Sequence, residues 1–484
     1  MSLKKTLILA LFLLGAVAYI LQVQVPSDQE KAALGLPFGS LNNESIESIE
    51  IAGPLGQYTL KNPDPKPAAA SAEPSVVEVD SLKKWELADV KGAEVDRSAL
   101  NALISTLIGF KLEEPLPAQD LDPDVAVYGL KEPDLRVRVT SAGKTTELQF
   151  GKENSYVAKR YVRIDGANDI YLVPSGLYSA ANKTKKEFRN KAPLEFLDNE
   201  LKSISLHTPS TGTIKFEIDD HYQWHIVQPA AYTASSTALA DLTREIRSMR
   251  AETFLDGDLK LSDYALDQPA LRVDMEFKPS AKREPLQLSF SPTGAKGVEQ
   301  AYLKVSDKAT IFKVEGNPVL KIAQPLENFR EKSLFKFATD QAVQLDFDLF
   351  QSAPLSIVRA GTDWLVNSKP GDVNFVRQLL ESLAALQAEG FPNDNRDYGF
   401  ANPRLKLVLR LVGPEPEKKV SERTLIVGDS ADKAGKSESR YYASVDGTSE
   451  PFLISKDTLK DIYPREEVLV KRQVEPTATP QSTP

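Results

Sequence analysis

Cysteine and histidine, which proteins often use for nucleophilic, redox and metal chemistry, are absent or scarce in this chain of 484 residues. It has no Cys, which excludes disulfides, thiolate zinc sites, iron–sulfur clusters and cysteine nucleophiles. Among its three His residues, His221 and His225 have the i, i+4 spacing of a helical metal pair. That spacing has this meaning only on a helix, and Asp219-Asp220-His221-Tyr222 predicts a hairpin turn before a strand that contains Trp224. We therefore predict no metal site at these histidines.

Two further segments have the composition of ligand-binding loops but lack required parts. Gly435-Lys436-Ser437 is similar to the end of a phosphate loop, yet Ser430 stands where that motif needs its earlier Gly. Asp256-Gly257-Asp258 offers two carboxylates, whereas Ca²⁺ takes six or more oxygen ligands, so we expect a solvated turn. The sequence thus predicts no catalytic residue, no cofactor and no metal. An Asp or Glu pair assembled from distant loops stays open.

The charge balance argues against nucleic acid as a partner. The chain has 59 basic and 68 acidic residues, a net charge of −9, whereas nucleic-acid binders concentrate Lys and Arg. A local basic cluster is expected to be a solvated helix face, with an acidic partner as the alternative. Its members are Lys183, Lys185, Lys186, Arg189 and Lys191.

A threefold internal repeat organises the sequence. Tyr, a small residue, a large apolar residue, two polar residues and Pro recur at steps of roughly 135 residues, and one Trp precedes each copy. The repeated residues are Tyr128, Gly129 and Pro133, then Tyr264 and Pro269, then Tyr398, Gly399 and Pro403, with Trp85, Trp224 and Trp364. We expect a structural role, in which Gly permits a turn, Pro precedes a strand and Tyr packs its ring. Ala265 in the second copy predicts that a positive φ is not strictly needed there.

Each repeat predicts an α+β domain of mostly antiparallel sheet with two helices. After each Trp strand comes a helix with an apolar stripe, and after each Tyr motif come strands with period-two alternation. The second helices are expected near 175–186, 318–329 and 455–463. The predicted organisation is a stem at 26–45, repeat domains at 46–195, 196–337 and 338–473, a disordered insertion at 62–80 and a disordered tail at 474–484.

The N-terminus predicts export. Two lysines precede an apolar run from Thr6 to Leu21, which indicates a signal anchor at 1–25. One N-terminal transmembrane helix would then precede the three α+β repeats and attach the chain to the inner membrane through residues 6–25. Cleavage after Ala18 is the alternative. On both interpretations the repeats lie outside the cytoplasm.

The order of these motifs resembles that of a known family. Tyr-Gly-Leu-x-x-Pro after an amphipathic helix, with closing segments that contain Phe188-Arg189 and Phe329-Arg330, looks like a bacterial domain of unknown function, family number 4340. The likeness covers nearly all of the chain beyond residue 45, and the third closing segment departs from it with Tyr463-Pro464-Arg465-Glu466. The resemblance implies an extracytoplasmic, usually membrane-anchored protein, often encoded beside ABC-type transporters that resemble the gliding-motility system. It implies no catalytic residue.

Together these observations predict a non-enzymatic binding or scaffold protein on the periplasmic side of a bacterial inner membrane. The expected partners are proteins, among them the permease or ATPase of an ABC-type export or gliding-like complex. One alternative is a carboxylate-dependent hydrolase of cell-wall or glycan substrates, which needs paired acids in a cleft. Another is a glycan-binding or adhesive protein that uses exposed aromatic residues such as Tyr441 and Tyr442.

Overall fold

The structure, a computed structural model, describes residues 44–66, 85–109, 112, 114–292, 301–333, 335–392, 396–413, 419–432, 439–446 and 450–471. Some predicted features lie outside these residues, namely the segment 1–25, most of the stem at 26–45, most of the insertion at 62–80, the Gly435-Lys436-Ser437 loop and the tail at 474–484.

The first residues of the predicted insertion belong to the fold. Asn62 is buried, and its Nδ2 donates a hydrogen bond to the carbonyl oxygen of Ile46 at 3.1 Å. The amide of Lys66 donates to the carbonyl oxygen of Glu44 at 2.8 Å. The prediction of a disordered insertion is therefore wrong for residues 62–66, because these bonds attach them to the start of the first strand.

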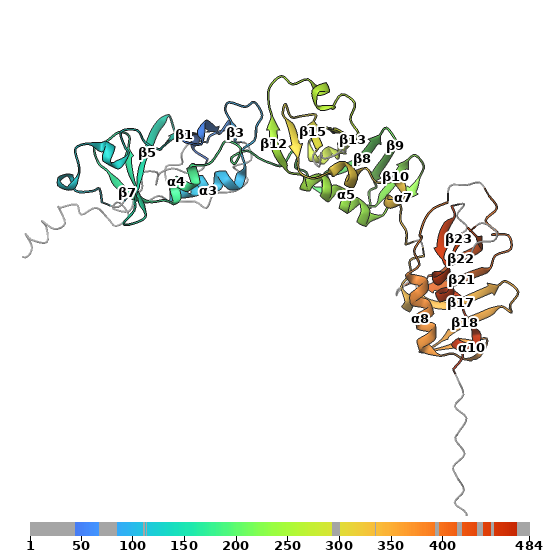
Figure 1. Cartoon of the computed structure of the whole chain (residues 1–484). Coiled ribbons are helices and arrows are strands. Elements are labelled where there is room, and N and C mark those ends of the chain that lie inside the picture. Colours follow the sequence, from blue (N-terminus) through green and yellow to red (C-terminus); the bar gives the residue numbers. More distant parts are fainter. Residues whose placement is uncertain are drawn as a thin grey trace, which may run out of the picture. The chain divides into compact units, whose positions relative to one another are not determined.

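Three large, mostly antiparallel sheets carry the fold, one from each predicted repeat (Figure 1). The first sheet has seven strands in the order β3-β2-β1-β4-β5-β6-β7. They are β1 (Ile46–Gly53), β2 (Gly56–Lys61), β3 (Glu86–Leu87), β4 (Leu135–Ser141), β5 (Lys144–Asn154), β6 (Lys159–Ile164) and β7 (Tyr171–Pro174). In β4, Leu135, Val137 and Val139 are buried while the residues between them are not, so the period-two pattern places one face on the core.

The second sheet has nine strands in the order β11-β10-β9-β8-β13-β14-β15-β16-β12. They are β8 (Leu201–Thr208), β9 (Gly212–Ile218), β10 (Trp224–Gln228), β11 (Tyr232–Thr233), β12 (Ala251–Leu255), β13 (Leu271–Phe277), β14 (Leu286–Phe290), β15 (Ala301–Val305) and β16 (Ile311–Val314). β9 and β10 flank the turn predicted at Asp219-Asp220-His221-Tyr222, so the hairpin prediction is confirmed.

The third sheet has eight strands in the order β20-β19-β18-β17-β21-β22-β23-β24. They are β17 (Ala342–Leu349), β18 (Leu355–Ala360), β19 (Asp363–Val366), β20 (Lys369–Pro370), β21 (Leu405–Val412), β22 (Val420–Ser430), β23 (Arg440–Val445) and β24 (Phe452–Ser455). Its central strands pair antiparallel with Leu345 opposite Leu409, which aligns their apolar faces on one core.

A long helix follows the Trp strand in each repeat, as the apolar stripes predict. These helices are α3 (Arg97–Ile108), α5 (Ser236–Ser248) and α8 (Val373–Ala384). Asp96 caps α3 by accepting a hydrogen bond from the amide of Ala99, and Asp372 caps α8 through the amides of Asn374 and Phe375. The buried stripes of α3 and α8 join the cores of the first and third sheets.

The closing helices correct the prediction of two helices per repeat. Repeat 1 has α4 (Gly176–Ala181), but repeat 2 has α6 (Pro318–Ile322) and α7 (Leu326–Phe329), and repeat 3 has α9 (Lys456–Ile462) and α10 (Glu466–Leu469). The single helix expected at 318–329 is interrupted before Pro325. A proline lacks the N–H that would continue the helix, and it disfavours helical geometry in the preceding residue.

The predicted fold class is also wrong at its N-terminus. In the part of the chain that the structure describes, no helix is long and apolar enough to cross a membrane, so the transmembrane helix is not supported. Residues 6–25, to which it was assigned, lie outside that part.

The chain divides into two compact units. One consists of residues 1–197, 247–272 and 286–319, and the other of 198–246, 273–285 and 320–484. The division runs through the second sheet, so the domain boundaries at 195 and 337 stay predictions.

Candidate functional site

The repeated Tyr makes the same contact in all three repeats. Each packs its ring against a Tyr of a neighbouring strand, with ring centroids 4.9 to 5.1 Å apart. The pairs are Tyr128 with Tyr161, Tyr264 with Tyr302 and Tyr398 with Tyr442. Pro133, Pro269 and Pro403 lie just before β4, β13 and β21. Because aromatic pairs at this separation attract each other, the Tyr fastens the turn to the sheet.

The residue after each Tyr has left-handed backbone geometry, with φ of 73° at Gly129, 53° at Ala265 and 76° at Gly399. The prediction that Ala265 has no strict need for a positive φ is wrong, because the same turn is imposed in all three repeats.

Two further glycines that the motif did not reveal make room for this turn. A Cβ on Gly151 would lie 2.1 Å from the carbonyl oxygen of Tyr128, and a Cβ on Gly428 would lie 2.1 Å from that of Tyr398. Both glycines interrupt the apolar alternation of a long strand, β5 or β22, and this interruption is the sequence signal that could have identified them.

The three tryptophans lie at equivalent places but differ in burial. Trp85 directly precedes β3 and is buried, Trp364 lies in β19 and is buried, and Trp224 begins β10 and is half-buried. Trp85 and Trp364 belong to the cores of the first and third sheets, whereas Trp224 is only partly buried.

Phe188 and Arg189 form the junction between repeats 1 and 2. Phe188 is buried in the core of the first sheet. The Arg189 guanidinium lies 4.1 Å from the ring centroid of Phe254 and donates two hydrogen bonds to Asp256, at 2.6 and 2.7 Å, and one to Thr310 at 2.7 Å. Its side chain is only 7% exposed, so the prediction of a solvated basic face is wrong for this member of the cluster. The hydrogen bonds from Arg189 hold the pKa of Asp256 below its usual range.

Phe329 and Arg330 form the junction between repeats 2 and 3 with the same parts. Phe329 packs edge-on against Phe216 with centroids 5.0 Å apart. The Arg330 guanidinium lies 3.6 Å from the ring centroid of Phe391 and 3.9 Å from that of Tyr232, and it forms an ion pair with Glu450 at 2.9 Å. Burial lowers the pKa of Arg330.

Backbone hydrogen bonds show that Phe254 and Phe391 are equivalent positions. The amide of Ala251 donates to the carbonyl oxygen of Lys191, and that of Ala388 donates to that of Lys332, both at 2.8 Å. Each lysine lies two residues after its junction arginine, and each phenylalanine three residues after its alanine. In both junctions an arginine of one repeat therefore stacks on a phenylalanine of the next.

The third closing segment matches the others at a different place from the one that the sequence predicts. The same backbone hydrogen bond occurs in all three repeats. The amides of Asp96, Ser235 and Asp372 donate to the carbonyl oxygens of Phe188, Phe329 and Leu469, respectively. Leu469-Val470 thus stands where the other repeats have Phe-Arg, and the alignment with Tyr463-Pro464-Arg465-Glu466 is wrong. Val470 stands at the position of the junction arginines.

A Thr–His–Asp cluster lies on three adjacent strands of the second sheet, and the sequence motifs gave no sign of it. The Nδ1 of His207 lies 2.9 Å from the Thr213 hydroxyl, and its Nε2 lies 2.7 Å from Asp274. In serine-protease triads Nε2 faces the nucleophile and Nδ1 faces the acid, so this orientation is reversed. We interpret the cluster as a polar ladder on the sheet surface.

The remaining candidate metal-binding side chains form local hydrogen bonds and ion pairs. Asp219 accepts hydrogen bonds from the amides of Gln223 and His221 and from Nε2 of His225, which lower its pKa to about 2. Asp256 forms an ion pair with Arg189, so its carboxylate is already engaged within the protein. Among the described residues, no group of three or more His, Asp or Glu side chains could hold a metal ion.

The aromatic residues proposed for glycan binding are not accessible. Tyr441 is 4% exposed and Tyr442 is 3% exposed. Tyr441 belongs to the core of the third sheet, and Tyr442 lies under Tyr398 on the opposite face of β23. The prediction that they are exposed is wrong because this strand is covered on both faces.

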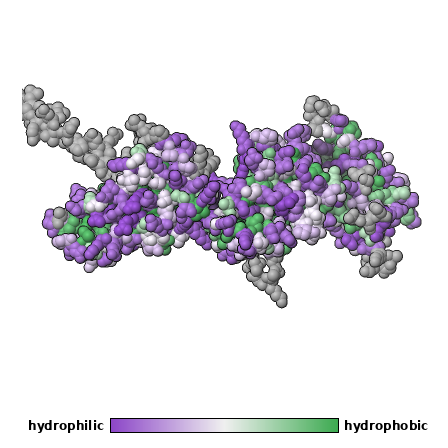
Figure 2. Space-filling model, turned by 90° about the horizontal axis from the view of Figure 1, so that it is seen from above, coloured by the Kyte–Doolittle hydropathy of each residue, from purple (hydrophilic) through white to green (hydrophobic). Residues whose placement is uncertain are grey.

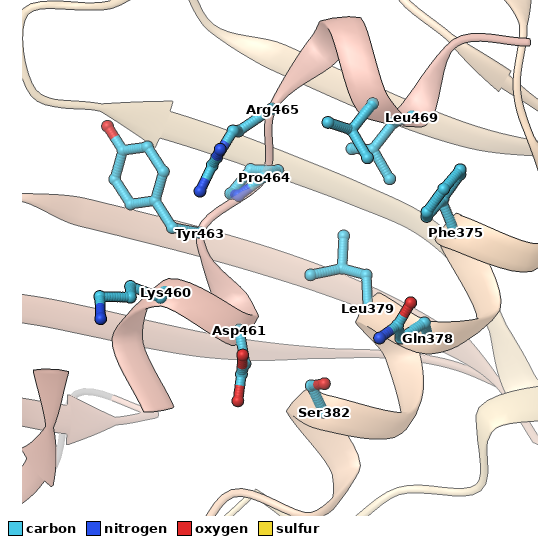
Figure 3. Close-up of a pocket in the computed structure, with 11 residues that line it drawn as sticks. Phe375, Gln378, Leu379, Ser382, Lys460, Asp461, Tyr463, Pro464, Arg465 and Leu469 are labelled. Atoms are coloured by element: carbon cyan, nitrogen blue, oxygen red, sulfur yellow. The ribbon is translucent and has the colours of Figure 1, made fainter. Parts of the chain in front are cut away.

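A groove opens between α8, α9 and α10 of the third repeat, with a volume of about 290 Å³. We call it the α8–α10 groove. Its lining residues are Phe375, Gln378, Leu379, Ser382, Lys460, Asp461, Tyr463, Pro464, Arg465, Val468 and Leu469. Figure 3 shows Phe375 and Leu469 at one end and Lys460 and Tyr463 at the other. The face of the molecule drawn in Figure 2 is largely hydrophilic with scattered hydrophobic patches.

Comparison with known proteins places the chain in a family. No curated protein and no solved structure matches it. The family described as Domain of unknown function (DUF4340) matches twice, at residues 85–269 and 224–403. The first match begins at Trp85 and ends at Pro269, and the second begins at Trp224 and ends at Pro403, so each spans one junction and ends with the Tyr motif of the next repeat. Because the two matches together cover more than half of its length, the chain belongs to this family of domains of unknown function.

Proposed function

We propose that this chain is a non-catalytic binding or scaffold protein that works outside the cytoplasm, as an accessory subunit of an ABC-type export or gliding-like complex. The observation that supports the proposal best is the α8–α10 groove, where exposed apolar side chains gather on the third repeat. The residues of the repeated signature, by contrast, pack within their repeats or form the junctions between them. A surface of this kind fits the binding of a protein partner.

The place of action and the class of partner rest on separate arguments. Two lysines followed by a run of apolar residues at the N-terminus support export. Membership of the family is shown, and the resemblance to it implies genes encoded beside ABC-type transporters, which supports a transporter partner.

Affinity purification of the full-length tagged chain from gently solubilised cells of its native bacterium tests the proposal. Recovery of a permease or an ATPase of an ABC-type transporter in a fixed molar ratio is the expected result. Quantitative mass spectrometry against an untagged strain gives that ratio. A chain that is recovered alone at all detergent concentrations would rule out the accessory role.

A further inference from the structure

The size of the α8–α10 groove limits what it can hold. Its volume of about 290 Å³ lies at the lower edge of the range of roughly 300–1,000 Å³ that is typical of small-molecule and cofactor pockets. The space accommodates one or two large side chains more readily than a whole cofactor. A segment of another protein, which inserts side chains and leaves its backbone outside, fits such a site.

The rim of the groove is apolar where α8 and α10 meet. Phe375 of α8 and Val468 of α10 line the groove and are 44% and 40% exposed. Val373, which begins α8, is 41% exposed but does not line the groove. The amide of Asp372 donates to the carbonyl oxygen of Leu469 at 2.7 Å, which holds the start of α8 against the end of α10. Large apolar side chains on a monomer surface are usually scattered singly, so this gathering indicates a contact surface.

A cation stands beside this apolar rim. Within the described residues, the guanidinium of Arg465 makes no hydrogen bond or ion pair, whereas the Nζ of Lys460 pairs with Asp457 at 2.7 Å. Figure 3 shows Arg465 beside Pro464 and apart from Asp461, the acidic residue of the lining. An arginine without a partner, placed next to apolar surface, therefore favours a ligand whose carboxylate lies at this part of the groove, beside its apolar group.

An ion pair bridges the same position in repeat 2. There Lys321 of α6 pairs with Glu245 of α5 at 2.9 Å across the two helices. By the common hydrogen-bond pattern of the closing segments, Asp461 of repeat 3 is equivalent to Lys321, and Ser382 is equivalent to Glu245. These two described residues form no such ion pair. Leu469 also stands where repeat 2 has the larger Phe329. The third repeat therefore differs from the second at the residues that line this place.

We infer that the α8–α10 groove binds a short segment of a partner protein that inserts a large apolar side chain and places a carboxylate against Arg465. This inference rests on the proposed function, because it names the chemistry of the partner at that site. The apolar side chain contacts Phe375 and Val468, and the carboxylate forms charge-assisted hydrogen bonds with the guanidinium.

Binding of two defined peptides to the full-length chain tests this chemistry. The probes are a fluorescein-labelled Glu-Ser-Leu-Phe-Ser-Glu peptide and its twin with both Glu replaced by Lys, measured by fluorescence anisotropy. The acidic peptide is expected to bind about tenfold more tightly than the basic one at low salt. Arg465→Glu should remove or invert this preference, and Phe375→Ser combined with Val468→Ser should abolish binding of both peptides.

Arg377→Glu is the matched control, since it makes the same charge change on α8 at a residue that does not line the groove. Circular dichroism and thermal unfolding confirm that each variant is folded. Equal affinity for the two peptides, or equal effects of Arg465→Glu and Arg377→Glu, would overturn the inference.

Photo-crosslinking in cells separates the possible occupants. A photoreactive amino acid at Val468 is expected to capture a partner segment with apolar and acidic residues, and Arg465→Glu should remove the crosslink. The control position is Val358, which is exposed on β18. Crosslinks only to residues 472–484 of the same chain, or only to a second copy, would overturn the inference.

The two proposals can fail separately. If a transporter subunit is still recovered with Arg465→Glu and the peptides do not bind, the groove inference fails and the accessory role stands. If the acidic peptide binds with the expected preference but no transporter subunit is recovered, the groove stands and the accessory role fails.

Discussion

Ala265 has a side chain where the equivalent turns have glycine. Its φ of 53° lies in the left-handed region, which costs an L-residue with a Cβ about 1 kcal/mol or more. The side chain is exposed, so it contributes little packing in return. The strain at this residue is therefore local and can be relieved by a single change.

We expect Ala265→Gly to raise the free energy of unfolding by about 0.5–1 kcal/mol, because the relief of strain exceeds the added entropy of the unfolded glycine. Urea unfolding followed by tryptophan fluorescence measures the change. Ala240→Gly is the control, since Ala240 is exposed in the interior of α5 and its loss should lower stability by about 1 kcal/mol. Changes of the same sign in both variants would contradict the strain argument.

At the scale of elements, the ion pair between Arg189 and Asp256 makes the first junction sensitive to acid. The pKa of Asp256 is lowered in the folded state, so its carboxylate stabilises the junction at any pH above its unfolded pKa of about 3.9. As the pH falls through the lower folded pKa, Asp256 is protonated and this contribution is lost.

Hydrogen exchange of β12, which directly precedes Asp256, reports on the junction. Between pH 6 and pH 3 we expect the protection of β12 to decrease more in the wild type than in Asp256→Asn, whose amide does not titrate in this range. The asparagine variant should be the less protected of the two at pH 6. Parallel pH profiles for the two proteins would show that other carboxylates cause the acid response.

The sequence predicts the elements well where one face of each is buried, as in β13 and β14, which lie where the alternation places them. It fails where periodicity carries no such information. β23 shows no alternation because both of its faces are covered, so its sequence pattern does not reveal that Tyr441 and Tyr442 are buried. The third closing segment is defined by its backbone hydrogen bonds, which include Leu469, and residue types alone do not identify it.

The groove could not be predicted at all. Repeats 2 and 3 differ at three equivalent positions around it, and the equivalence follows from the backbone hydrogen bonds of the closing segments. Each difference alone, such as Leu469 in place of phenylalanine, is a conservative change in sequence.

At the scale of the whole molecule, the junction arginines connect successive repeats. Arg330 is 12% exposed and contacts aromatic rings of both repeats 2 and 3. We expect Arg330→Ala to lower the free energy of unfolding by about 2 kcal/mol, from two cation–π contacts and one ion pair. Differential scanning calorimetry should also show a broader or split transition, as the cooperativity between repeats weakens.

Arg330→Lys distinguishes shape from charge in the same experiment. It keeps the positive charge but loses the planar group that stacks between two rings, so it should recover less than half of the loss. Arg377→Ala, an exposed arginine of α8, should change stability by less than about 0.5 kcal/mol. Full recovery by lysine would mean that charge alone holds the junction.

The junction phenylalanine and arginine also decide which repeats can be joined end to end. Repeat 2 has both an acceptor phenylalanine, Phe254, and a donor arginine, Arg330. In repeat 1 the residue equivalent to Phe254 is Pro115, because Leu116 bonds to Ile170 as Leu255 pairs with Ile311. In repeat 3 the residue equivalent to Arg330 is Val470. A gene duplication of repeat 2 would join to itself and to both neighbours with existing residues. The middle repeat thus has both junction residues, whereas repeat 1 has only the arginine and repeat 3 only the phenylalanine.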